Sequence, residues 1–211
     1  MNTPRPAPPL PPPLQPAAAA KAVTEAAQAA ASAWATTLPP AAHGRAVSQL
    51  HSILRDLGIA TRGLATYQVT DIPPGPQSGE FSRHVGSGSR WLLSAWQCLD
   101  YFLAAEGIPP SGDPGEPGAA LCQAARHAIL AWRQPQGTAA ERDETVRRLV
   151  TATGFISAAV LSLSLYATRQ TTMDLQTAGH HLAEATAALS AAIQLPDDNP
   201  APRRQAVPDE R

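Results

Sequence analysis

Two adjacent histidines and a glutamate are the first residues whose types and spacing could do chemistry. His180, His181 and Glu184 lie close together, and His180 and Glu184 are one helical turn apart. Imidazole and carboxylate groups at such spacing can bind a transition metal. The seam of the same predicted helix projects to the other side; it consists of Leu175, Leu182, Thr186, Leu189 and Ile193. We therefore predict that the histidines and the glutamate face solvent, and we keep a metal site as the alternative.

The glycine-rich stretch GSGSR, residues 86–90, is the second candidate. Free backbone N–H groups at a helix start, together with an arginine, can hold an anion such as phosphate. This makes Gly86, Gly88 and Arg90 candidate anion-binding residues. No predicted strand precedes the stretch, and it matches neither the P-loop nor the dinucleotide-binding pattern. We therefore favour an ordinary helix start, with Ser87 or Ser89 as the N-cap residue.

Neither cysteine belongs to a recognisable reactive motif. Cys98 and Cys122 are 24 positions apart and lack a CxxC context. We predict that both are small core residues, because cysteine is among the residue types most often buried. No serine, cysteine or histidine lies in a nucleophile motif. The sequence therefore assigns no catalytic residue and no cofactor.

The charge and composition of the chain argue against one class of partner and indicate the kind of organism that encodes it. The formal net charge is −1, so there is no basic excess to neutralise nucleic-acid phosphates. Lys21 is the only lysine against fifteen arginines, and alanine and proline are abundant. This bias indicates GC-rich coding and predicts a bacterial source. No apolar run follows Arg5, so we predict no secretory signal and a cytoplasmic protein.

Helical periodicity runs through most of the chain, and strand signals are nearly absent. The predicted helices cover residues 17–37, 41–67, 90–106, 119–133, 138–168 and 172–194, and residues 71–89 are predicted to form an irregular connection. Thr138 and Glu141 have the spacing of a capping box. Gly58 and Gly63 inside the second helix predict a kink or a close helix contact. The predicted fold class is all-α, a bundle of five or six helices without a sheet.

Both ends of the chain differ from its centre. Half of residues 1–16 are prolines, and residues 196–211 mix prolines and charges with few apolar groups. Such segments bury too little apolar surface to offset their ordering entropy. We therefore predict a disordered Pro-rich arm at 1–16, a helical-bundle domain at 17–195 and a disordered tail at 196–211.

The fifth predicted helix is a candidate membrane span, because residues 149–168 carry no charge. About twenty apolar residues suffice to span a bilayer. At least six of these positions hold Ser, Thr or Gly, and no aromatic belt marks both ends. We therefore predict a helix at the centre of the bundle, with a membrane span as the alternative.

Together these observations predict a non-enzymatic helical-bundle protein, a bacterial accessory or regulatory component that binds another protein. One alternative is a bundle enzyme or ligand-binding protein that holds a small molecule or a metal between its helices. A third possibility is a membrane-associated component that uses residues 149–168. The partner protein is not identified by the sequence.

Overall fold

The computed structural model describes residues 15–35, 40–71, 73, 75–110, 117–167 and 171–194. Most of the predicted arm (1–16) and the whole of the predicted tail (196–211) lie outside the described residues. Six helices make up most of the described chain, so the predicted all-α bundle is confirmed. They are α1 (Pro16–Trp34), α2 (Pro40–Leu64), α3 (Pro76–Ala105), α4 (Ala119–Ala131), α5 (Ala139–Ser164) and α6 (Thr172–Ile193).

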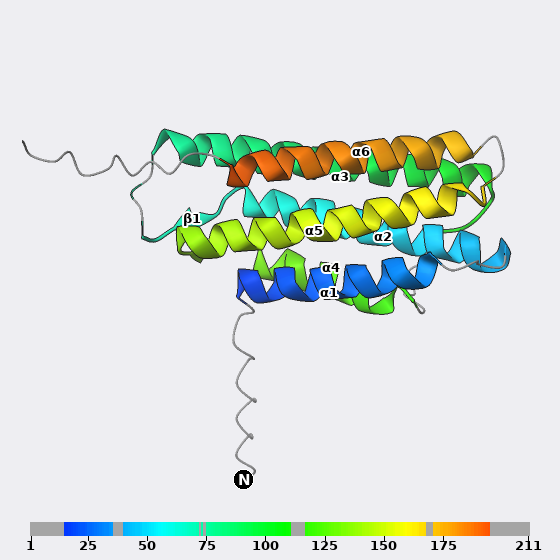
Figure 1. Ribbon diagram of the computed structural model, residues 1–211, viewed down its shortest axis with the longest axis horizontal. Helices are drawn as coiled ribbons and strands as arrows, with labels where there is room; N and C mark the ends of the chain where they lie inside the picture. The colour runs from blue at the N-terminus through cyan, green and yellow to red at the C-terminus, as the bar shows by residue number, and fades with distance from the viewer. Residues whose placement is uncertain are drawn as a thin grey trace, which may run out of the picture.

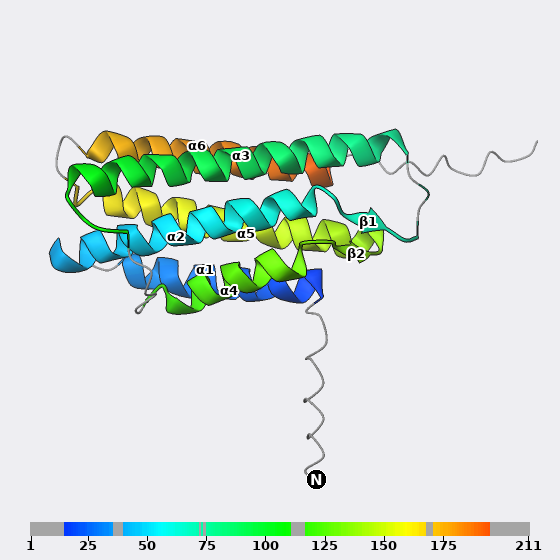
Figure 2. The same cartoon turned by 180° about the vertical axis from the view of Figure 1, so that it is seen from behind.

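The helices form two layers of three (Figures 1 and 2). One layer contains α6, α5 and α1, with α5 in the middle, and the other contains α3, α2 and α4, with α2 in the middle. The layers are joined at their edges, where α3 packs against α6 and α1 packs against α4. The core lies between the two layers.

The seam predicted for α2 faces this core. Val47, Leu50, Leu54, Leu57 and Leu64 are fully buried, and Thr61 in the remaining seam position is buried too. Gly58 and Gly63 of α2 make the predicted close contacts. A Cβ at Gly58 would lie 2.7 Å from Leu93 Cδ2, and one at Gly63 would lie 2.1 Å from the Trp132 carbonyl oxygen. Glycine therefore lets α3 and the end of α4 approach α2.

The predicted irregular connection at 71–89 is wrong over most of its length, because α3 begins at Pro76. The helix start predicted at GSGSR is wrong for the same reason: these residues lie in the middle of α3. Ser89 is not an N-cap; its hydroxyl is buried and donates to the Gly58 carbonyl oxygen. Three glycines and several serines gave this half of α3 the composition of a loop, although Phe81, Val85 and Leu92 bury one helical face.

The expectation of no sheet fails at one small place. Residues Gln68–Val69 (β1) pair in parallel with Gln136–Gly137 (β2). The connections that follow α2 and α4 run side by side there, so their backbone groups satisfy one another. Thr70 N–H donates to the Gly137 carbonyl oxygen, and Gln68 N–H donates to the Pro135 carbonyl oxygen.

Helix α5 begins with the predicted capping box. The Thr138 hydroxyl accepts from the Glu141 N–H, and the Glu141 carboxylate accepts from the Thr138 N–H. The helix lies between α1 and α6, as expected for a central helix, but it is not surrounded. Among the described residues it alone is long and apolar enough to cross a membrane, and 44% of its most apolar stretch is buried inside the protein. One face of α5 buries Ile156 and Val160, and the opposite face is exposed.

Candidate functional site

The predicted histidine group is split between solvent and a helix interface. His180 is exposed, whereas His181 is half-buried and stacks on Trp91 of α3, with ring centroids 5.2 Å apart. The expectation that both histidines face solvent is therefore wrong for His181, because α3 covers that side of α6. Burial and the neighbouring His180 lower the pKa of His181, and Glu184 raises it by a smaller amount. Within the described ranges, no three His, Cys, Asp or Glu side chains are grouped so that they could hold a metal ion.

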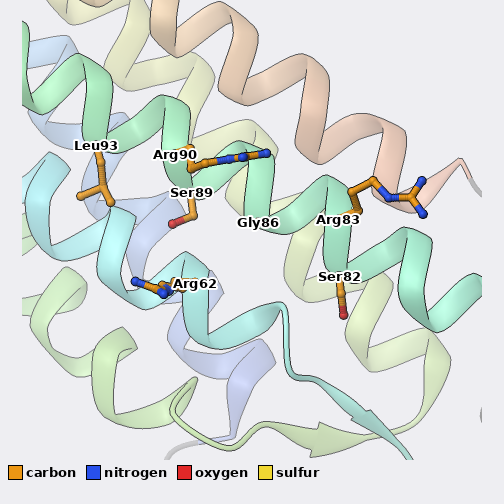
Figure 3. Close-up of a pocket in the computed structure, with 7 residues that line it drawn as sticks. All are labelled: Arg62, Ser82, Arg83, Gly86, Ser89, Arg90 and Leu93. Carbon is orange, nitrogen blue, oxygen red and sulfur yellow. The ribbon is translucent and has the colours of Figure 1, made fainter.

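A pocket of about 390 Å³ lies between α2 and α3 (Figure 3). We call it the α2–α3 pocket; it is lined by Arg62 from α2 and by Ser82, Arg83, Gly86, Ser89, Arg90 and Leu93 from α3. The α3 residues form two adjacent rows at steps of three and four, one of Ser82, Gly86, Ser89 and Leu93 and one of Arg83, Gly86 and Arg90, so they share one side of the helix. This volume falls in the range of about 300–1,000 Å³ that is usual for small-molecule sites.

Two hydrogen bonds set the width of the α2–α3 pocket. The Ser89 hydroxyl donates to the Gly58 carbonyl oxygen at 2.8 Å, and the Ser82 hydroxyl donates to the Ala65 carbonyl oxygen. Figure 3 shows both serines pointing from α3 toward α2. The two hydrogen bonds are seven residues apart on α3 and seven residues apart on the other side, where Ala65 directly follows α2; Arg62 lies between Gly58 and Ala65 in the sequence.

The absence of a side chain at Gly86 keeps the α2–α3 pocket open. A Cβ built at this position meets no atom within 4 Å. Glycine in a helix interior costs roughly 1 kcal/mol relative to alanine. No close neighbour requires this glycine, in contrast to Gly58 and Gly63.

The charges of the α2–α3 pocket are not neutralised by the rest of the described chain. Arg62, Arg83 and Arg90 are exposed, and none forms an ion pair with a described residue. Glu80, one turn before Arg83, is also exposed and lies in no ion pair there. The three guanidinium groups extend in different directions (Figure 3). The pocket is thus a local excess of positive charge in a chain whose net charge is −1.

Two of the three anion candidates predicted from the sequence lie in this pocket. Gly86 and Arg90 line it. Gly88 is buried on the α6 side, where a Cβ would lie 2.7 Å from Leu189 Cγ, so it serves helix packing instead. Arg62 and Arg83 were not among the residues predicted to bind an anion. Arg83 and Arg90 are seven residues apart, which places them on one face of a helix, but only if α3 is known to contain both. The position of Arg62 depends on how α2 pairs with α3, which the sequence does not show.

The exposed face of α5 is a second candidate site. Thr151, Gly154, Ala158, Leu161 and Leu165 follow steps of three and four, and all five are exposed. We call this stripe the outer seam. Leu161 is 48% exposed and Leu165 is 81% exposed. The same spacing is typical of helix pairs, in which it forms the contact line. The outer seam thus has the pattern of a helix interface but no covering helix among the described residues.

The thiols are not activated. Cys122 is buried, as predicted, and Cys98 is half-buried. Burial raises the pKa of Cys122 to about 11; Arg126 lowers it by a smaller amount and Asp56 raises it further, so this thiol is protonated at neutral pH. Burial and the nearby Asp174 also raise the pKa of Cys98. Only a thiolate is a good nucleophile, so these thiols have little reactivity.

A scan of protein-family models, a search of curated proteins and a search of solved structures found no match to the chain.

Proposed function

We propose that the protein is a non-enzymatic helical bundle that acts by binding a helix of another protein along the outer seam of α5. The observation that carries this proposal is the row of exposed apolar and small residues at the spacing of a helix interface. The exposed positions of the neighbouring α1 hold alanine or polar residues, such as Lys21, Glu25 and Gln28, and no large apolar side chain. Exposed apolar rows of this kind mark interaction surfaces more often than scattered single residues do.

The residues along the outer seam suit a helix better than a loop. Gly154 and Ala158 have almost no side chain, so a partner helix could approach α5 closely at this end. Leu161 and Leu165 follow, and burying each leucine completely is worth roughly 1.5–3 kcal/mol. An amphipathic helix with apolar groups at matching spacing would bury both. Tyr166 and Met173, 44% and 71% exposed, extend the apolar surface around the turn between α5 and α6.

The test compares two exposed leucines on different layers. A photo-crosslinking amino acid at position 165 identifies the protein that contacts the seam in cells, and its affinity is then measured with purified components. We expect Leu165→Asp to weaken this binding at least about tenfold, or about 1.4 kcal/mol. Leu130→Asp on α4 is the matched control, because Leu130 is 73% exposed and lies far from the seam in the fold. Equal affinity of wild type and Leu165→Asp would contradict the proposal.

Light scattering of the purified chain identifies one special case. A dimer that Leu165→Asp converts to a monomer, and that Leu130→Asp leaves intact, would make the partner helix α5 of a second copy. A protein that is monomeric and crosslinks to no other protein through position 165 would argue against a role in protein binding.

A further inference from the structure

We propose that the α2–α3 pocket is a binding site for the phosphate group of a small phosphorylated molecule. It lies in the other layer from the outer seam, and this proposal does not depend on the proposed function. The charge of the pocket, its fixed width and its volume support this assignment.

The α2–α3 pocket is positively charged. Arginine stays protonated at every physiological pH, so Arg62, Arg83 and Arg90 bring three permanent positive charges to one pocket. None has a carboxylate partner in the part of the chain that the structure describes. Five of the seven other described arginines form ion pairs, as in Arg148–Glu144 at 2.6 Å and Arg55–Asp56 at 3.0 Å. The pocket therefore favours an anion.

The residue type favours phosphate among anions. A guanidinium group presents a planar fork of N–H donors that matches two phosphate oxygens at once. A phosphate monoester carries close to two negative charges at neutral pH and three strong acceptor oxygens. A single carboxylate would leave more of the positive charge of the pocket unpaired. The serine hydroxyls already donate to α2 carbonyl groups, so the arginines must supply the donors.

The shape of the α2–α3 pocket leaves room for the rest of the molecule. Its volume of about 390 Å³ exceeds what a phosphate group alone would fill. Gly86 and Leu93 give it a partly apolar lining, against which a short carbon skeleton can lie. The two serine bonds hold α2 and α3 at fixed separation, so the pocket does not depend on the ligand for its width.

The three arginine side chains have to turn toward the phosphate when it binds. Their guanidinium groups do not meet at one point in the free protein (Figure 3). All three are exposed and unpaired within the described chain, so no ion pair has to break before they turn toward the ligand. Arg83 and Arg90 lie two turns apart on α3 and Arg62 lies on α2, so both helices contribute guanidinium groups to the pocket.

Calorimetric titration of the full chain with sn-glycerol 3-phosphate, at low ionic strength, tests the proposal. We expect saturable binding at one site per chain. Arg62→Ala and Arg90→Ala should each weaken it at least about tenfold, or about 1.4 kcal/mol. Arg45→Ala is the matched control, because Arg45 is also an exposed arginine on α2 without an ion pair to a described residue. No saturable binding, or equal weakening by Arg45→Ala, would overturn the proposal.

A second pair of variants tests the cavity rather than the charge. Gly86→Leu places a side chain in the α2–α3 pocket and should abolish binding. Gly154→Leu on α5 is its control, since a Cβ there also meets no atom within 4 Å. Unchanged circular dichroism shows that both variants fold. Full binding by folded Gly86→Leu would overturn the proposal.

Two further probes identify the source of the phosphate. Inorganic phosphate should bind more weakly than glycerol 3-phosphate, because it lacks the carbon skeleton. Phosphatidylcholine vesicles containing phosphatidic acid should not bind, or should bind equally well to Arg62→Ala. Vesicle binding that needs Arg62 and Arg90, without binding of glycerol 3-phosphate, would overturn the small-molecule assignment in favour of a lipid headgroup.

Discussion

Gly63 shows how one residue sets the distance between two elements. A Cβ there would lie 2.1 Å from the Trp132 carbonyl oxygen and 2.9 Å from its carbon, both backbone atoms that cannot rotate away. We expect Gly63→Ala to destabilise the protein by about 1–3 kcal/mol, because the end of α4 must shift. Gly154→Ala should instead stabilise it by about 0.4–1 kcal/mol, since its surroundings are open. Urea unfolding measures both, and equal stability of the two variants would contradict this account.

His51 couples stability to pH. Burial lowers its pKa most; Asp100 at 3.3 Å raises the pKa and Arg55 lowers it further. The folded state therefore resists protonation more than the unfolded state, whose histidine pKa is about 6.5. Stability from this group is complete above about pH 6.5 and is lost as the pH falls from there toward the lower pKa of the folded state.

Urea unfolding between about pH 7.5 and about pH 5.5 tests this coupling. The midpoint should fall with the pH in the wild type, and less steeply in His51→Gln. His181, whose pKa is also lowered, keeps part of the slope in that variant. His127→Gln on α4 is the control, because His127 is exposed. If the urea midpoints of His51→Gln and His127→Gln depended on pH equally steeply, the buried His51 would not be the source of the pH dependence.

At the scale of elements, the start of α5 depends on one reciprocal pair of hydrogen bonds. Thr138 and Glu141 each satisfy a backbone N–H that the first helical turn leaves without a partner. Thr138→Ala should cost about 1 kcal/mol. Thr151→Ala should cost less than about 0.5 kcal/mol, because Thr151 is exposed and bonds only to the carbonyl one turn back. Thermal unfolding compares them, and a similar loss in both would show that the cap contributes nothing.

Five of the six helices follow from local signals, and α3 shows where such signals fail. Apolar periodicity and terminal prolines or caps predict α1, α2, α4, α5 and α6 within a few residues of their ends. The first half of α3 contains Gly79, Gly86 and Gly88, which lower helix propensity. Gly88 is compatible with the helix because Leu189 of α6 packs against it, a contact that no local pattern contains. The α2–α3 pocket was therefore predictable only in part, through Gly86 and Arg90.

The sequence did not show that the outer seam of α5 would be exposed. The uncharged length of α5 predicts burial, and its inner residues are buried. Which of its faces stays uncovered depends on the two-layer arrangement, in which α1 and α6 flank α5 and α2 lies behind it (Figure 1). That arrangement is set by the pairing of all six helices.

At the scale of the whole molecule, the packing of α5 against α1 and α6 leads us to expect that α5 does not enter a membrane. Leaving the bundle would uncover the core faces of α1 and α6, which include Val23 and Leu182, both fully buried. We therefore expect the wild type to remain in the soluble fraction without detergent.

Ile156 is 1% exposed, so Ile156→Asp would bury an unpaired carboxylate. This would cost several kcal/mol, a large part of a typical stability of about 5–15 kcal/mol. That variant should aggregate or become protease-sensitive, whereas Leu165→Asp on the outer seam should stay soluble and folded. Recovery of the wild type in a carbonate-resistant membrane pellet would instead make α5 an anchor, with the outer seam facing lipid.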